Sequence, residues 1–428
     1  MADSIVSRMK TLIGGRRERQ SLSPRLLAQL RQQLSECAAG TGGEVSVRNR
    51  AAKLGETYLG LDDAGRHEFL RRIALDFGPD PAKVDAAHRA YQTAVGTPGQ
   101  WDAEADLRGA LRSSRIRILT QFNALPQGVK FLVDLRADLL RFLDKDEELA
   151  VLDRELESRL TAWFDVGFLE LSRITWNSPA SLLEKLIQYE AVHEIRSWND
   201  LRNRLDSDRR LYAFFHPRMP QEPLIFVEVA LTPEMPGAIN TILSEKRKLV
   251  DPHKANCAIF YSISNCQKGL LGIPFGNFLI KRVAGLLSDE LPQLKTFATL
   301  SPVPGFARWL SGELGEGAKL PGDRQLRTLA AKYLVNGRKK KGTVLDSVAR
   351  FHLGNGARLE AIHTGADMSP NGLRQSHGVM VNYVYDMAQI EANHIALFEL
   401  DTVPASKAVM SLLETDKPKP EKPSKQAA

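Results

Sequence analysis

The stretch YSISNCQKGLLGIPFGNFLIKRVAGLL, from Tyr261 to Leu287, contains a predicted strand, a loop with glycines and a helical pattern. The strand is expected because β-branched and aromatic residues are frequent at its start. Gly269, Gly272 and Gly276 follow, and the helical pattern begins near Asn277. Glycines let a backbone approach a ligand closely, and the free N–H groups at a helix start favour an anion such as a pyrophosphate. This stretch therefore predicts a phosphate-binding loop within an α/β domain.

The spacing of the loop excludes two common nucleotide motifs. It lacks the G-K-[ST] ending of a P-loop, and it is not G-x-G-x-x-G. Its spacing Q-x-G-x-x-G, from Gln267 to Gly272, is closer to the pyrophosphate loop of the acetyl-CoA-dependent N-acetyltransferase fold. An ordinary connecting loop is the alternative interpretation.

Working outward from this loop, the two halves of the chain differ in pattern. Residues 1–160 carry leucines at helical spacing, and Ser23 before Pro24 is expected to cap the first of these helices. Residues 161–413 contain strand patterns separated by helical ones, which predicts a mixed α/β domain. The segment 414–428 is rich in Pro, Lys and Glu, which is typical of a disordered tail.

The composition limits the classes of function. The chain has 428 residues and a net charge of +7, which favours an anionic partner or simply serves solubility. The three cysteines form no C-x-x-C pair and no H-E-x-x-H motif occurs, so no metal site is expected. Nucleic-acid motifs, a secretory signal and a membrane-length apolar run are not found in the sequence, and the predicted compartment is the cytoplasm.

Two residues stand out as catalytic candidates. Ser301 ends the predicted strand Phe297–Leu300, where ligands gather in open α/β sheets, and Pro302 and Pro304 restrict the backbone around it. A turn serine that caps the next helix is the alternative. His352 precedes a Gly-Asn-Gly sequence that suits a tight hairpin, and a structural histidine is the alternative there.

Further pocket candidates are Tyr383, Asn382 and His216. Tyr383 and Tyr385 alternate at strand spacing, so both are expected on one face, where core packing is the alternative role. His216 lies in a proline-bounded turn before a strand.

Seven segments taken together resemble the malonyl-CoA decarboxylase family, in family order from about residue 129 to residue 385. They are KFLVDLRADLL, ITWNSPASLLEKLIQYEAVHEI, EPLIFVEVALT, FYSISNCQKGLLGIPFGNFLIKRV, TLSPVPGFARWL, FHLGNGA and HGVMVNYVY. The resemblance implies an α+β multidomain fold, in which an all-α domain for oligomerisation precedes an acetyltransferase-like (acyl-CoA N-acyltransferase) α/β catalytic domain. It also implies a homo-oligomer, a tetramer in the family.

The same resemblance implies the reaction and its residues. Malonyl-CoA would be converted to acetyl-CoA and carbon dioxide, with no metal and no organic cofactor. Ser301 and His352 would be the catalytic pair. The loop that binds CoA would consist of Leu271, Gly272, Ile273, Pro274, Phe275, Gly276 and Asn277. Animal members of the family have an acidic residue where this chain has Pro274, so the role of that carboxylate is not transferable.

The chemistry assigns each candidate a task. Loss of carbon dioxide leaves a thioester enolate, which hydrogen-bond donors near its oxygen would stabilise. Ser301 would hold the carboxylate in the reactive orientation, and His352, titrating near neutral pH, would protonate the carbanion as a general acid. Two alternatives stay open: a CoA-dependent acyltransferase, which needs an acceptor groove and a base for an amine, and a non-catalytic CoA-binding scaffold.

Overall fold

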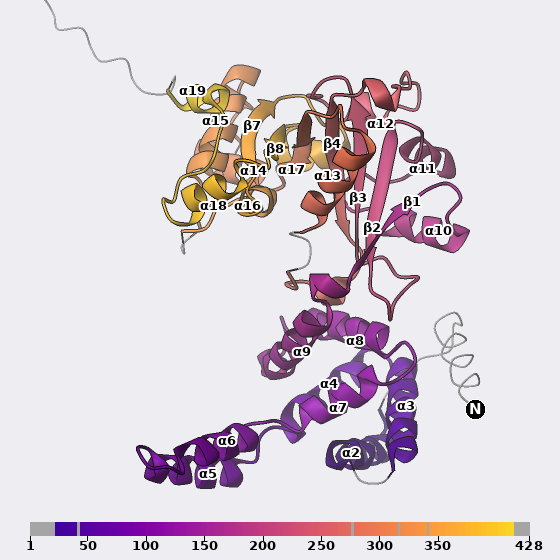
Figure 1. Ribbon diagram of the computed structural model, residues 1–428, viewed down its shortest axis with the longest axis vertical. Coiled ribbons are helices and arrows are strands. Elements are labelled where there is room, and N and C mark those ends of the chain that lie inside the picture. The colour runs from indigo at the N-terminus through magenta and orange to yellow at the C-terminus, as the bar shows by residue number, and fades with distance from the viewer. Residues whose placement is uncertain (1–21, 41–42, 275–277, 316, 340–341, 415–428) are drawn as a thin grey trace, which may run out of the picture. The chain divides into compact units, whose positions relative to one another are not determined.

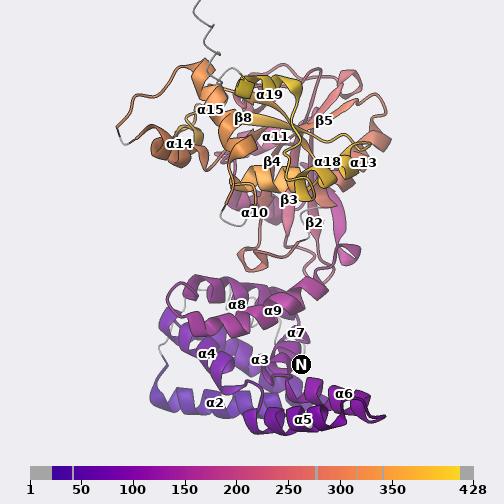
Figure 2. The same cartoon turned by 90° about the vertical axis from the view of Figure 1, so that its left-hand side faces the viewer.

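Apolar side chains at helical spacing build the N-terminal helices that the sequence predicts. The computed structural model describes residues 22–40, 43–274, 278–315, 317–339 and 342–414, and its course is shown in Figures 1 and 2. The N-terminal helices, with two short 3-10 turns, are α2 (Pro24–Ala39), α3 (Glu44–Gly60), α4 (Asp63–Asp76), α5 (Pro81–Ala94), α6 (Gln100–Ala110), α7 (Arg115–Asn123), α8 (Gly128–Phe142), η1 (Glu147–Leu149), α9 (Ala150–Trp163) and η2 (Val166–Phe168).

Helix α2 illustrates how local sequence fixes these elements. The hydroxyl of Ser23 accepts a hydrogen bond from the N–H of Leu26, which confirms the predicted N-cap. The helix ends where Gly40 adopts φ +66°, a left-handed conformation that glycine takes without steric cost. Between these ends, Leu30 and Leu34 are fully buried. Helical spacing and two end signals therefore suffice to define this element.

Strands and helices alternate in the rest of the chain. The strands are β1 (Glu170–Ile174), β2 (Arg209–Phe215), β3 (Ile225–Thr232), β4 (Cys257–Asn265), β5 (Thr296–Thr299), β6 (Ser301–Pro302), β7 (Arg358–His363) and β8 (Met380–Val384). The helices and 3-10 turns are α10 (Ala180–Tyr189), α11 (Trp198–Arg204), α12 (Asn240–Leu243), η3 (Pro252–Lys254), η4 (Lys268–Leu270), α13 (Leu279–Glu290), α14 (Phe306–Leu314), α15 (Asp323–Asn336), α16 (Ser347–Gly354), α17 (Pro370–Ser376), α18 (Ile390–Phe398) and α19 (Lys407–Glu414).

The strands form one mixed sheet. Its order is β1-β2-β3-β4-β5-β8-β6, and β7 pairs with β8. Strands β2, β3 and β4 are antiparallel neighbours, whereas β4 and β5 are parallel and are connected through α13. A β-bulge interrupts β3 and β4, because Glu228 pairs with Ser262 and Val229 with Phe260. Since bulges redirect side chains, this one changes the course of β4 beside the end of β5.

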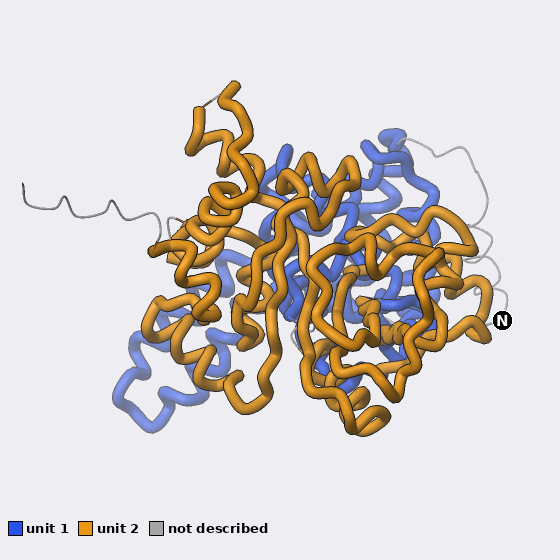
Figure 3. The backbone as a smooth tube through the Cα atoms, turned by 90° about the horizontal axis from the view of Figure 1, so that it is seen from above, with its two compact units in different colours: residues 1–170, 215–223, 267–274 blue, residues 171–214, 224–266, 275–428 orange. Residues whose placement is uncertain are grey.

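The chain divides into two compact units, coloured in Figure 3. One comprises residues 1–170, 215–223 and 267–274, and the other comprises residues 171–214, 224–266 and 275–428. The predicted succession of an all-α region and a mixed α/β region is confirmed. The predicted boundary at residue 160 stays a prediction, and so does the disordered tail, because residues 415–428 lie outside the described ones.

One local prediction is wrong. The Gly-Asn-Gly sequence after His352 makes no hairpin, because His352 lies on α16 and the turn connects this helix to β7. Gly356 adopts φ +83° there, and a Cβ atom would come within 2.7 Å of Ile390. A glycine signal marks a turn, but it does not specify whether a strand or a helix precedes the turn.

Among the described helices, none combines the length and the apolar character needed to cross a membrane.

Candidate active site

Ser301 lies at the end of the parallel strand pair in the middle of the sheet. Ser301 pairs with Val381 of β8 in the sheet, and its side chain is buried. The hydroxyl donates to Oγ1 of Thr299 at 2.8 Å and lies 3.1 Å from Nε2 of His352. The two predicted catalytic residues are 51 positions apart in the sequence and in direct hydrogen-bond contact in the fold.

The position of His352 is fixed by helix α16 and by strand β8. The carboxylate of Asp346 caps the start of α16 and also accepts a hydrogen bond from the N–H of Gly305, in the segment that follows Ser301. The imidazole stacks on the ring of Tyr383 with 4.8 Å between ring centroids. Its Nδ1 lies 2.9 Å from the hydroxyl of Tyr385. Three separate segments of the chain, the one after β5, α16 with its cap, and the end of β8, therefore meet around one imidazole.

Burial determines the charge of this imidazole. Desolvation lowers the pKa of His352 from its ordinary value of 6.5 to about 3, so the ring is neutral at pH 7. The predicted titration of His352 near neutral pH is therefore wrong. A sequence pattern does not show how completely a side chain is removed from water.

The contacts of Tyr385 indicate which nitrogen of His352 carries the proton. Within the described residues, the hydrogen bond of the buried Tyr385 hydroxyl is to Nδ1 of His352, so the hydroxyl donates and Nδ1 accepts. Nε2 then carries the hydrogen and donates to the oxygen of Ser301, whose own hydrogen points to Thr299. The hydrogen bonds therefore run in one direction: Tyr385 donates to His352, His352 donates to Ser301, and Ser301 donates to Thr299.

The other pocket candidates do not all join this pair. Tyr383 does join it, because its ring stacks on the imidazole of His352. The amide of Asn382 instead donates to the carbonyls of Thr299 and Pro236, on the opposite face of β8. His216 belongs to the helical unit, where its Nε2 donates to the carbonyl of Trp163 and its Nδ1 accepts the N–H of Arg218. Both ring nitrogens of His216 thus have backbone partners, which suits a structural role.

Sequence reasoning missed Thr299 and Asp346. Thr299 precedes Ser301 by two positions, and the period of a strand places both side chains on one face, so this partner was accessible to pattern analysis. Asp346 carried no comparable signal, because its contact with Gly305 spans 41 positions.

Comparison with known proteins shows the same organisation along the chain. The sequence of residues 77–164 matches the family model of the malonyl-CoA decarboxylase N-terminal domain. Residues 167–322 and 318–423 match the family model of the C-terminal domain. The mitochondrial malonyl-CoA decarboxylase of Anser anser anser is 35% identical over 422 residues, which cover 86% of this chain and 84% of the relative. That of Mus musculus is 35% identical over 415 residues, covering 83% of each chain.

The chain belongs to the malonyl-CoA decarboxylase family.

Solved structures agree with this assignment. The crystal structure of malonyl-CoA decarboxylase from Rhodopseudomonas palustris superimposes with a TM-score of 0.83 at 41% identity, covering 91% of this chain and 100% of that one. The structure from Agrobacterium vitis gives a TM-score of 0.84 at 41% identity, covering 90% and 99%. The predicted malonyl-CoA decarboxylase family, its enzyme class (a carboxy-lyase) and the succession of a helical region and a mixed α/β domain are confirmed. The acetyltransferase-like character of the second domain stays a prediction.

The loop that malonyl-CoA decarboxylases are expected to use for CoA is described only in part. Residues 271–274 belong to the helical unit, and Phe275, Gly276 and Asn277 lie outside the described residues. Gly272 adopts φ +89°, and Arg136 of α8 donates to the carbonyls of Gly269 and Leu271. Gly269 packs so closely on α8 that a Cβ atom would lie 1.8 Å from the carbonyl oxygen of Val133. Gly269 and Leu271, at the entry to this loop, are therefore held against α8.

Proposed function

We propose that this chain converts malonyl-CoA to acetyl-CoA and carbon dioxide through a thioester enolate, with Ser301 and His352 as the catalytic pair. The observation that carries the proposal is the 3.1 Å contact between Ser301 Oγ and His352 Nε2, buried at the end of β5. Membership of the malonyl-CoA decarboxylase family supports the substrate. As the resemblance implies, no metal and no organic cofactor take part.

In the first step the carbon–carbon bond to the carboxylate breaks. Ser301 would turn its hydroxyl from Thr299 to the substrate carboxylate and hold the breaking bond perpendicular to the thioester plane. The electron pair moves into the thioester, and backbone N–H groups near its oxygen would stabilise the negative charge. The role of Ser301 is positioning, so no acyl-enzyme is required.

In the second step the carbanion carbon takes a proton. Because the imidazole of His352 is neutral, it would act as a hydrogen-bond donor and weak acid through Nε2–H, as other buried neutral imidazoles do in enolate chemistry. Ser301 accepts the hydrogen bond from Nε2–H and would pass the proton on to the carbanion, and a proton from solvent would restore the pair after the product leaves. Tyr385 would hold His352 in the tautomer that donates toward Ser301.

The CoA-binding loop is proposed as residues Leu271–Asn277. The support is the positive φ of Gly272 and the attachment of Leu271, the first residue of the loop, to α8, since a fixed backbone loses little freedom when it binds a diphosphate. Pro274 supplies no carboxylate, so the chemistry would have to proceed with Ser301, His352 and Tyr385 alone.

Two variants test the assignment. Ser301→Ala and His352→Ala should each lower turnover of malonyl-CoA by at least about 10²-fold, because each removes a group that acts on the reacting atoms. Release of carbon dioxide and accumulation of acetyl-CoA measure turnover, and the far-ultraviolet circular dichroism of each variant checks its fold. Near-normal turnover of either folded variant would refute the role of that residue.

The same assay separates the alternatives. Accumulation of acetyl-CoA from malonyl-CoA alone supports the decarboxylase, whereas tight CoA binding without turnover supports a scaffold. A homo-oligomer, a tetramer by family resemblance, stays a prediction, as does the cytoplasm. The animal relatives are named mitochondrial, so fractionation of the source cells is the measurement that decides the compartment.

A further inference from the structure

A second polar site lies on the face of the sheet opposite to Ser301. Leu300 belongs with Ile239 to one buried cluster, and Ser301, the next residue along the strand, points to the other face. Ile239 also lines a cavity of about 1040 Å³, and the other lining residues come from the segments 190–204, 240–246 and 367–374. All of these segments belong to the same compact unit. The cavity is therefore distinct from the site of the catalytic pair.

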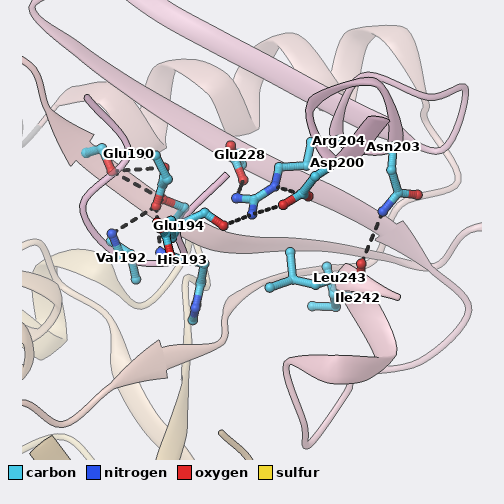
Figure 4. A network of polar contacts seen from close by, with 12 residues as sticks. Glu190, Val192, His193, Glu194, Asp200, Asn203, Arg204, Glu228, Ile242 and Leu243 are labelled. Atoms are coloured by element: carbon cyan, nitrogen blue, oxygen red, sulfur yellow. Dashed lines mark hydrogen bonds and ion pairs between the residues drawn. The ribbon is translucent and has the colours of Figure 1, made fainter. Parts of the chain in front are cut away.

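Hydrogen bonds attach the segment that carries His193 to strand β4. The carboxylate of Glu190 accepts the N–H groups of Val192 and His193, at 2.9 and 2.7 Å, and Figure 4 shows these bonds. The same carboxylate accepts the hydroxyl of Ser262 of β4 at 2.8 Å. The backbone of His193 is therefore tied to the sheet, whereas its imidazole takes no part in these contacts.

The buried cation of the cavity wall already has partners. Arg204 is 2% exposed, and it donates to the carboxylates of Asp200 and Glu228 at 3.0 and 3.1 Å. It also donates to the backbone carbonyl of Glu194, as Figure 4 shows. An anionic group of a ligand could reach Arg204 only by replacing one of these carboxylates. The buried end of the cavity is therefore unsuited to an anion.

The imidazole of His193 offers the cavity an unused acceptor. His193 is 8% exposed, and its Nε2 is buried without a hydrogen-bond partner in the part of the chain that the structure describes. Burial lowers the pKa of His193 from its ordinary value of 6.5, so the ring is neutral at pH 7. The backbone of Tyr261 accepts a hydrogen bond from the ring. Because Nε2 has no partner, this bond leaves from Nδ1, and Nε2 carries a lone pair that lacks a donor.

A buried carboxylate lies near this acceptor. Asp367 lines the same cavity, is 6% exposed, and lies close enough to His193 for its charge to act on the pKa of the ring. Its Oδ1 accepts the N–H of Ser369 at 3.0 Å, and no cation is paired with it within the described residues. A charged and a neutral acceptor that both lack a donor suit an ammonium group, which has three N–H donors and a positive charge.

The rest of the lining suits an aliphatic chain and an anion. Its apolar side chains include Val192, Ile239 and Leu243. The exposed rim carries three cations and two carboxylates, which are Arg196, Lys246, Arg374, Glu194 and Glu245. Among the described residues the side chains of Arg196 and Lys246 form no ion pair, so both are available to a carboxylate of a ligand. The two ends of the cavity thus differ in charge preference.

We propose that this cavity is a binding site for a small ω-amino acid, whose ammonium group is held by Asp367 and by Nε2 of His193 and whose carboxylate lies at the cationic rim. An α-amino acid fits less well, because its two charges are on one carbon and cannot reach the buried floor and the exposed rim together. The ligand binds reversibly and unchanged. The inference is independent of the proposed function, since neither Ser301 nor a thioester takes part.

Isothermal titration calorimetry of the full-length chain tests the ligand class. The probes are 4-aminobutanoate, 6-aminohexanoate and 8-aminooctanoate, with glycine, hexylamine and hexanoate as controls. The best of the three ω-amino acids should bind with a Kd of about 1 mM or below, in the range that two charge-assisted contacts support. Glycine and hexanoate should bind at least about tenfold more weakly, and hexylamine more weakly than 6-aminohexanoate. No binding of any ω-amino acid, or equal binding of hexanoate, would overturn the proposal.

A pair of carboxylate variants tests the floor. Asp367→Asn keeps an oxygen that can accept the N–H of Ser369 but removes the charge, and it should raise the Kd of the best probe at least about tenfold. Asp251→Asn is the matched control, because Asp251 also accepts the N–H two residues further on but does not line the cavity. The control should keep the Kd of the unchanged protein. Equal Kd values for the two variants would contradict the assignment.

Two further variants test the acceptor nitrogen and the separation of the sites. His193→Asn can replace the donor at Nδ1 but has no atom at the position of Nε2, so it should raise the Kd at least about tenfold. Far-ultraviolet circular dichroism checks its fold, and an unaltered Kd in the folded variant would refute the role of Nε2. Ser301→Ala should keep the Kd, and CoA should not displace the probe. Displacement by CoA would overturn a separate site, whereas probe binding without any decarboxylation would overturn only the proposed function.

Discussion

Tyr383 of β8 and Tyr385, the residue that follows this strand, both contact His352, but their hydroxyl groups differ. The hydroxyl of Tyr385 donates to Nδ1 of His352, whereas that of Tyr383 is buried without a hydrogen-bond partner among the described residues. Tyr385→Phe should lower kcat by about tenfold and leave KM for malonyl-CoA nearly unchanged. The variant leaves Nδ1 of His352 as a buried acceptor without a partner, which costs about 1–3 kcal/mol, and nothing then selects the tautomer that carries its hydrogen on Nε2. Tyr383→Phe is the matched control and should keep kcat. Equal effects of the two variants would refute the tautomer argument.

The neutral imidazole of His352 also makes stability depend on pH. Its folded pKa is about 3 against an ordinary value of 6.5, so below pH 6.5 the unfolded chain binds a proton that the folded chain does not. The free energy of unfolding should therefore fall as the pH drops from 6.5 toward 3, by about 1.4 kcal/mol per pH unit from this group. His352→Gln lacks the group, so its urea-unfolding free energy should fall less steeply between pH 6.5 and 5. Parallel curves for the two proteins would contradict the neutral state.

Between elements, a single arginine joins α11 to β3. Arg204 is 2% exposed and donates to Asp200 of α11 at 3.0 Å and to Glu228 of β3 at 3.1 Å. Burial raises the pKa of Glu228 to about 7 even with Arg204 in place. Arg204→Met would leave two buried carboxylates unpaired, and should lower the free energy of urea unfolding by about 3–5 kcal/mol. Arg202→Met, on the exposed side of the same helix, should cost less than about 1 kcal/mol.

At the scale of the whole molecule, helices α5 and α6 carry no buried residue. Trp101 of α6 is 73% exposed, and the predicted homo-oligomer would cover such a surface. Trp101→Asp should therefore reduce the mass measured by light scattering toward the 47.6 kDa of one chain. Val45→Asp, an equally exposed apolar position on α3, should keep the mass of the unchanged protein. A chain that is already monomeric, or an unaltered mass in Trp101→Asp, would contradict this prediction.

The sequence by itself determined the succession of a helical and a mixed α/β region and the family, and it predicted Ser301 and His352 as a pair. It could do so because spacing and motifs are local properties, and because seven segments in family order are specific together. The tertiary structure decided the rest: the charge of His352, the hydrogen bond from Tyr385, the backbone partners of His216, and the cavity around His193. Those features depend on burial and on contacts between residues far apart in the chain, and neither can be inferred from the residues that are adjacent in the sequence.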